Sequence, residues 1–192
     1  MNRNYEGWRA IWHVLSTPFA VGLALRVSPE YGMYLLWMIV VGVEFLRTRV
    51  EYVRNAFLAV MNGIIRDDER DGRPTAAPAM VTGLVLAWWI APAGTFWLCV
   101  ICVACVDPAA RLVGIHYGLT PFPGAGKKTC EGFLGAWIAG AFAASASGCV
   151  LPLSTVIGFV AAIGEIIGKH EPWWQDDNLF IPVFVSIALR LL

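Results

Sequence analysis

Polar side chains able to take part in catalysis are concentrated in four short segments of this 192-residue chain. Arg9 and His13 stand four residues apart, a spacing that places both on one face of a helix. The second segment, residues 66–69, reads Arg-Asp-Asp-Glu. The third and fourth segments span residues 107–132 and 165–182, and each combines carboxylates with basic residues. These four segments are the candidates for a functional site.

The third segment contains a glycine-rich stretch followed by paired lysines. Lys127, Lys128 and Thr129 come directly after two glycines, and Gly132 follows them. It is not a Walker phosphate loop, because Pro121 stands where that motif needs its first glycine and no hydroxyl residue follows the first lysine. Backbone N–H groups, ammonium groups and a hydroxyl nevertheless complement phosphate oxygens. The stretch therefore predicts a cradle for a polyphosphate.

Three carboxylates, those of Asp107, Glu131 and Glu165, stand at the ends of apolar runs. Ionisable groups beside membrane segments are costly to bury, so such positions favour a functional role. Carboxylate oxygens are hard ligands of the kind that Mg²⁺ prefers, and lysines neutralise phosphates. Together they predict a magnesium–nucleotide site. A structural alternative stays open, in which Glu131 caps a helix N-terminus and Asp176 and Asp177 cap the last helix.

Composition indicates that these segments belong to a membrane protein. Hydrophobic residues make up 58% of the chain and charged residues 15%, with a mean hydropathy of +0.63. Typical soluble domains are about 45–50% apolar and about 25% charged. A chain of this length hides only about 70% of its unfolded surface, so the excess cannot all be buried. An ordinary soluble domain, a disordered protein and a disulfide-stapled module are therefore excluded. Fourteen basic residues balance fourteen acidic ones, which gives no basis for nucleic-acid binding.

Apolar runs near membrane-spanning length recur along the chain and predict an all-α, polytopic membrane helix bundle of about seven transmembrane segments. Residues 1–192 are expected to form a single integral-membrane domain. The expected spans are residues 10–27, 33–46, 76–92, 95–106, 131–147, 153–167 and 178–192. Residues 47–65 carry apolar side chains at three-to-four spacing and predict an amphipathic helix at the membrane interface.

The distribution of charge predicts the orientation of this bundle. If the seven spans alternate, twelve of the fourteen basic residues fall on one side, and only Arg26 and Arg190 fall on the other. The positive-inside rule then places the N-terminus and the four polar segments in the cytoplasm. The active site is accordingly expected at the cytoplasmic face.

Two other patterns are interpreted as packing features. Cys99, Cys102 and Cys105 lie on one stripe of an apolar run with no fourth ligand at suitable spacing, so they are expected to pack between helices rather than to bind a metal. Gly132 and Gly140 flank Ala136 in a small-residue stripe suited to close helix packing, which leaves a homo-oligomer open.

The order of the polar segments resembles that of membrane enzymes that use CTP. Residues 107–118 read DPAARLVGIHYG, residues 127–132 read KKTCEG, and residues 177–182 read DNLFIP. The first two are similar to a signature shared by phosphatidate cytidylyltransferases and CTP-dependent lipid kinases (dolichol kinase, phytol kinase, yeast-type diacylglycerol kinase). The third is similar to the ending of the kinases. Arg9 and His13 resemble an N-terminal R-K-x-x-H motif in which Ala10 replaces the lysine. Further positions that fit the kinase pattern are Glu44, Arg47, Asn55, Arg66, Glu69 and Gly83.

The resemblance implies transfer of the terminal phosphoryl group of CTP to the hydroxyl of a lipid alcohol. Asp107, Glu131 and Asp177 are the implied catalytic residues, holding Mg²⁺ or positioning the acceptor. The implied nucleotide- and phosphate-binding residues are Lys127, Lys128, Thr129, Gly132, Arg66 and Asn178. The supporting residues are His13, Glu69 and Glu165, with Arg66 and Glu69 near the entrance. CTP, a lipid alcohol and membrane lipids are the expected partners.

Several alternatives stay open at this point. A phosphatidate cytidylyltransferase would use the same signature to make CDP-diacylglycerol and release pyrophosphate. A non-catalytic transporter or scaffold would place its ionisable groups near the bilayer midplane instead. Polyprenol, a phytol-like prenyl alcohol and diacylglycerol all fit as acceptors. Either Asp107 or Asp177 could be the general base.

Overall fold

The computed structural model describes residues 3–65, 67–70, 72–169 and 173–192. Within these ranges the regular structure is helical, and no strand forms beyond an isolated bridge between Pro121 and Thr129. The expected all-α class is therefore confirmed for the described part of the chain.

The seven longest described helices correspond to the seven predicted apolar runs. They are α1 (Arg3–Val27), α2 (Gly32–Arg49), α5 (Ala77–Ile90), α6 (Phe96–Tyr117), α7 (Cys130–Ala146), α8 (Leu151–Ile167) and α9 (Asp177–Leu191). Three shorter elements complete the chain: α3 (Glu51–Met61), α4 (Asp67–Arg70) and the 3₁₀ turn η1 (Trp173–Gln175). Gly, Pro and Ser residues occupy the tight turns that join the long helices at one end of the bundle.

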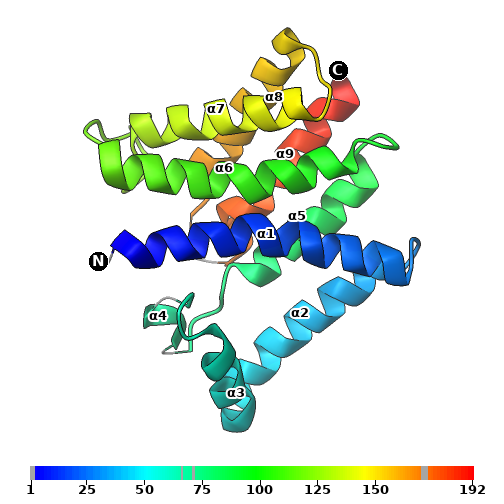
Figure 1. The fold of residues 1–192 in the computed structure, drawn as a ribbon, viewed down its shortest axis with the longest axis vertical. Helices are drawn as coiled ribbons and strands as arrows, with labels where there is room; N and C mark the ends of the chain where they lie inside the picture. The colour runs from blue at the N-terminus through cyan, green and yellow to red at the C-terminus, as the bar shows by residue number, and fades with distance from the viewer. Residues whose placement is uncertain (1–2, 66, 71, 170–172) are drawn as a thin grey trace.

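The helices pack as a bundle with α6 at its centre. Helices α1, α6 and α7 lie side by side, and α5, α8 and α9 cross behind them (Figure 1). The closest neighbours are α6 with α7, α7 with α8, and α9 with both α5 and α8. Helix α2 packs on α1 and α5 and extends away from the bundle, with α3 at its far end (Figure 1).

The core contains the small residues that the sequence singled out. Cys99 and Cys102 are buried among apolar neighbours of α6, which confirms a packing role. Gly140 and Gly158 bring α7 and α8 into backbone contact, since a Cβ on Gly158 would lie 2.4 Å from the Ala141 nitrogen. The small-residue stripe on α7 is thus used for helix packing inside the chain.

In the part of the chain that the structure describes, two helices are long and apolar enough to cross a membrane, namely Glu6–Val27 within α1 and Phe96–Tyr117. Helices α5, α7 and α8 are apolar but only 14–17 residues long. At about 1.5 Å per residue they span about 21–26 Å, less than the roughly 30 Å hydrocarbon core of a bilayer.

Two local expectations need correction. The span predicted to end at residue 106 continues as helix through Pro108 to Tyr117, because residues 109–117 pack against α1 and α7. Asp107 therefore lies within α6 rather than after it. The amphipathic helix predicted over residues 47–65 is shorter, Glu51–Met61; it has no buried residue and packs on α2.

Candidate active site

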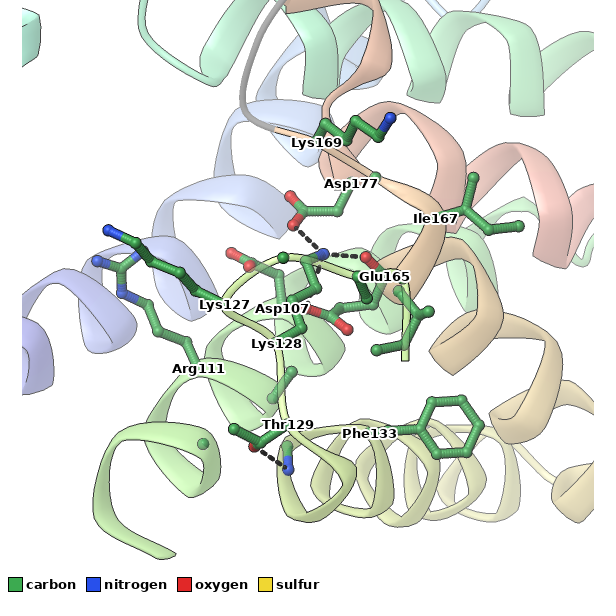
Figure 2. A pocket seen from close by; sticks show the side chains of 18 of the residues that line it. Asp107, Arg111, Lys127, Lys128, Thr129, Phe133, Glu165, Ile167, Lys169 and Asp177 are labelled. Atoms are coloured by element: carbon green, nitrogen blue, oxygen red, sulfur yellow. Dashed lines mark hydrogen bonds and ion pairs between the residues drawn. The ribbon is translucent and has the colours of Figure 1, made fainter. Parts of the chain in front are cut away.

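A cavity of about 1060 Å³ opens at one end of the bundle (Figure 2). Its walls come from the second half of α6, the loop 118–129, the start of α7, the end of α8 and the start of α9. Seven charged residues line it: Asp107, Glu165, Asp177, Arg111, Lys127, Lys128 and Lys169. The third and fourth sequence segments thus supply one site, although about thirty residues separate them along the chain.

The loop before α7 is a closed hairpin that directs two adjacent lysines in different directions. Cys130 N donates to Thr120 O at 2.9 Å, and Phe122 N donates to Lys128 O at 2.8 Å. Gly124 and Gly126 close the tip with φ of 76° and 66°, a region that favours glycine. Lys128 reaches into the cavity, whereas Lys127 is exposed and extends toward Arg111 (Figure 2).

Lys128 joins the loop to both α8 and α9. Its Nζ lies 3.0 Å from Glu165 Oε1 and 3.0 Å from Asp177 Oδ2, and it also donates to the backbone oxygen of Glu165. Burial lowers the pKa of Lys128, but the carboxylates of Asp177 and Glu165 outweigh burial and hold that pKa above its ordinary value. The ammonium group therefore stays charged between the two carboxylates at neutral pH.

The start of α9 fixes the position of Asp177. Asp176 caps this helix, as the sequence predicted, by accepting from Asn178 N at 3.0 Å. Asn178 Nδ2 donates to Asp177 Oδ1 at 3.1 Å, while Asp177 Oδ2 faces Lys128. Gly168 packs directly on the Asp177 backbone, where an added Cβ would lie 2.3 Å from Asp177 Cα. Asn178, expected to bind nucleotide, does not line the cavity; it orients the Asp177 carboxylate.

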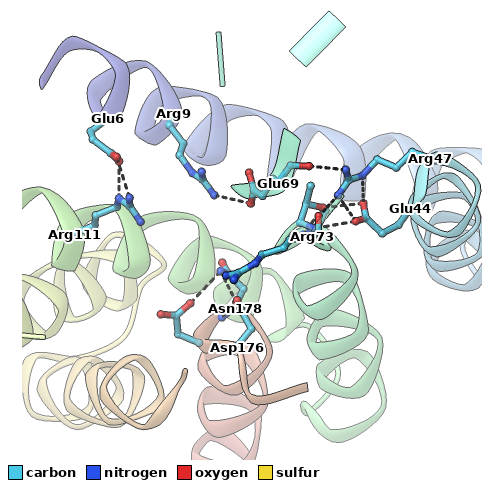
Figure 3. Close-up of polar contacts among 12 residues, drawn as sticks. Glu6, Arg9, Glu44, Arg47, Glu69, Arg73, Arg111, Asp176 and Asn178 are labelled. Carbon is cyan, nitrogen blue, oxygen red and sulfur yellow. Dashed lines mark hydrogen bonds and ion pairs between the residues drawn. The ribbon is translucent and has the colours of Figure 1, made fainter. Parts of the chain in front are cut away.

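Arg111 belongs to the third candidate segment, but the sequence assigned it no role; it lines the cavity and holds the N-terminal helix beside it. Its Nε and Nη2 donate to the two carboxylate oxygens of Glu6 at 2.5 Å and 2.9 Å (Figure 3). Such a bidentate pair is geometrically specific. An arginine one helical turn after Asp107 was the available sequence signal, but nothing in the sequence pointed to Glu6.

A second polar network borders the site and holds the segment between α3 and α5. The buried Arg47 pairs with Glu44 at 2.6 Å and donates to the backbone oxygens of Glu69 and Arg73 (Figure 3). Arg9 Nη2 lies 3.5 Å from Glu69 Oε1. The first and second sequence segments therefore meet next to the cavity without lining it. Arg66, predicted to contact the nucleotide, lies outside the described residues.

Three further residues predicted for the site contact backbone groups of the protein. Thr129 caps α7, because its Oγ1 accepts from Gly132 N at 3.1 Å. Glu131 does not line the cavity, and its carboxylate accepts from the backbone nitrogens of Leu119 and Thr120 at 3.1–3.2 Å. His13 Nε2 lies 3.2 Å from Val103 O, between α1 and α6. Of the carboxylates expected to hold Mg²⁺, the cavity thus brings together Asp107 and Asp177, with Glu165 beside them.

The donor set of the cavity fits Mg²⁺ in the form of a metal–nucleotide complex. Among the described residues no group of three or more His, Cys, Asp or Glu side chains is arranged to hold a metal ion by itself. Mg²⁺, however, is usually bound through one or two carboxylates together with substrate phosphates and water. Asp107 and Asp177 supply such oxygens in the same cavity as exposed lysines.

Comparison with known proteins finds no match. Neither a protein-family model, nor a curated protein, nor a solved structure is significantly similar to this chain. The resemblance to CTP-dependent lipid kinases therefore rests on the sequence motifs of the chain alone.

Proposed function

We propose that this protein is a CTP-dependent lipid kinase, which transfers the terminal phosphoryl group of CTP to the hydroxyl of a lipid alcohol. One observation carries the proposal. Two segments resemble these kinases, residues 107–132 and 177–182. The first lines the cavity at several positions, the second reaches it through Asp177, and the ion pair between Lys128 and Asp177 joins the two. Residues with no functional relationship would not be expected to meet in this way at a single charged opening.

On this proposal the charged lining binds the metal–nucleotide substrate. Lys127 and Lys169 are exposed at the cavity and would meet the phosphate oxygens first. Asp177 would contact the magnesium that accompanies CTP, and Asp107 lines the same cavity. A phosphoryl group passes through a loose transition state, so positioning and charge stabilisation by these side chains are the expected sources of catalysis.

The acceptor hydroxyl must lose a proton as it attacks. A new bond forms between its oxygen and the terminal phosphorus, the bond to the bridging oxygen breaks, and CDP leaves. Both carboxylate oxygens of Asp177 already accept hydrogen bonds, from Asn178 and Lys128. We therefore assign the proton-accepting role to Asp107, which lines the same cavity on α6.

The proposal includes a seven-span membrane bundle with the cavity at the cytoplasmic face. Helix α1 contains one of the two described segments long enough to cross a bilayer. It exposes Leu15, Phe19 and Leu23 at four-residue spacing, with exposed fractions of 64%, 72% and 55%. Such a continuous apolar face is typical of contact with lipid. The shorter helices would require local thinning of the bilayer. A cavity at the membrane surface is accessible both to a water-soluble nucleotide and to a lipid hydroxyl.

The direct test of activity uses the purified protein in lipid vesicles with Mg²⁺, CTP labelled at the terminal phosphate, and a panel of lipid alcohols. A kinase yields CDP and a labelled lipid phosphate, and chelation of Mg²⁺ stops the reaction. Asp107→Asn is expected to lower turnover at least a hundredfold, whereas Glu30→Gln, at an exposed turn between α1 and α2, leaves it unchanged. Release of pyrophosphate would instead show a cytidylyltransferase, and no reaction with any alcohol would favour a non-catalytic scaffold.

The orientation of the protein in the membrane is tested separately, by cysteine labelling in sealed vesicles of known sidedness. Lys127→Cys and Ser145→Cys place exposed thiols at opposite ends of α7, in a background where Cys130 and Cys149 are replaced by alanine. A membrane-impermeant maleimide should reach the first thiol only from the cytoplasmic side and the second only from the opposite side. Labelling of both thiols from one side would contradict the membrane-spanning arrangement.

A further inference from the structure

We propose that the hydrocarbon tail of the lipid acceptor lies along an aromatic strip on the outer surface of α7 and α8. The strip consists of Phe122, Phe133, Trp137 and Phe159. This inference rests on the proposed function, because it assigns the second substrate of the same cavity to a surface of this chain.

The four rings form one connected set drawn from three elements. Phe133 on α7 lies 5.4 Å from Phe122 on the loop and 5.9 Å from Phe159 on α8, measured between ring centroids. Trp137, one turn further along α7, lies 5.1 Å from Phe159. Phe159 is 40% exposed and the other three rings are partly exposed. Phe133 and Trp137 pack against the core on their inner side, so the strip presents an apolar surface outward on top of the core.

The strip begins inside the cavity. Phe133 belongs to the cavity lining and to the strip, so the two are continuous. The cavity itself has two chemically different sides: Arg111 and Lys127 lie on one, and Phe133 and Ile167 lie on the other (Figure 2). A lipid whose hydroxyl reaches Asp107 cannot place its tail favourably against the charged side. The apolar side is the exit that matches a hydrocarbon chain.

The tail must run over the outside of α7 and α8 rather than between them. Beside Trp137 and Phe159 these helices touch at Gly140 and Gly158, where a Cβ on Gly140 would lie 2.9 Å from the Cα of Gly158. This contact leaves no space for a chain. The indole N–H of Trp137 already donates to Thr155 O at 3.0 Å, so the strip offers its rings and no unsatisfied donor at that position. An apolar chain is therefore the occupant that fits, rather than a second polar headgroup.

The first experiment measures how turnover depends on acceptor chain length. The purified full chain in vesicles is assayed with a long prenyl alcohol and with a short, water-soluble one. Phe159→Ala removes most of one ring and is expected to lower the ratio of kcat/KM for the long over the short alcohol about tenfold. Phe142→Ala is the matched control, because Phe142 is also exposed on α7 but belongs to a different stripe with Leu134 and Ile138. The ratio of kcat/KM for the long over the short alcohol in Phe142→Ala should equal that of the unaltered protein.

Phe122→Ala provides a second variant on the loop, independent of any effect of Phe159→Ala on helix packing, and the same fall in ratio is expected. An unchanged ratio in both variants would overturn the inference. If the unaltered protein phosphorylates no alcohol, the proposed function fails before either variant is compared.

The second experiment does not require catalysis. A photoactivatable long-chain alcohol is bound to the protein in vesicles, irradiated, and located by mass spectrometry. We expect labelling on residues 133–137 and 159, reduced at least severalfold in Phe159→Ala and competed by unlabelled long-chain alcohol. Labelling confined to the exposed face of α1 would overturn the inference even in a protein that is an active kinase.

Discussion

The ammonium nitrogen of Lys128 lies 3.0 Å from Asp177 Oδ2, and the two residues are 49 positions apart in the sequence. This pair closes the loop 118–129 over the cavity and ties it to the first turn of α9. Because Glu165 Oε1 lies 3.0 Å from the same nitrogen, one cation serves two carboxylates. The pair therefore holds the loop in place and has a proposed role in catalysis. Substitutions can separate these two roles.

Lys128→Ala is expected to abolish turnover and to destabilise the protein. Removing the ammonium leaves Asp177 and Glu165 as largely buried carboxylates without that partner, and breaking a buried ion pair costs about 3 kcal/mol. Thermal unfolding in detergent should show a clear fall in Tm. Lys127→Ala is the matched control: this exposed side chain should change Tm little while raising KM for CTP. Equal Tm values for the two variants would contradict the structural role of Lys128.

The double variant Lys128→Met with Asp177→Asn separates stability from activity. Lys128→Met alone leaves both Asp177 and Glu165 without their cation, whereas the double variant leaves only Glu165 without it, because the Asp177 charge is removed as well. Groups in direct contact couple by about 0.5–3 kcal/mol, so the double variant should be more stable than the sum of the single variants predicts. Turnover should nevertheless be absent. A double-mutant cycle of unfolding free energies, measured beside the CTP assay, provides both values.

Gly168→Ala should displace Asp177 and destabilise the end of α8. The new Cβ would lie 2.3 Å from Asp177 Cα and 2.4 Å from its nitrogen, and backbone at that distance has to move. We expect a lower Tm and a large loss of turnover. Gly42→Ala is the control, because no atom lies within 4 Å of a Cβ at that position on α2. Alanine is favoured over glycine in a helix by about 0.5–1 kcal/mol, so this control should be neutral or stabilising.

Thr129 substitutions test whether its hydroxyl caps α7 or serves the nucleotide alone. Thr129→Ser keeps an oxygen able to accept from Gly132 N, whereas Thr129→Ala loses it. The free energy of unfolding of the alanine variant should be about 1 kcal/mol lower than that of the unaltered protein, and the serine variant should recover most of that loss. Equal stability of all three proteins, with turnover lost only in the alanine variant, would contradict the capping role.

Hydrophobic patterning alone was enough to predict the seven long helices. Seven apolar runs correspond to seven long helices, because an apolar segment of this length satisfies its backbone hydrogen bonds locally as a helix. The buried cysteines of α6, the N-cap at Asp176 and the position of Glu165 near the end of α8 were also predictable from local pattern. The continuation of α6 past Pro108 was not, since a proline inside a helix is normally a sign of its end.

The sequence by itself determined which residue types are available for chemistry and that they border apolar helices. Only the tertiary structure decided which of them meet. It placed Asp107, Lys128 and Asp177 in one cavity, turned Glu131 toward backbone nitrogens of the loop, and paired Arg111 with Glu6. The physical reason is that helix formation depends on neighbours within a few residues, whereas an ion pair depends on how distant helices pack. The contact between Gly168 and Asp177 is one such packing event, and no spacing in the sequence reveals it.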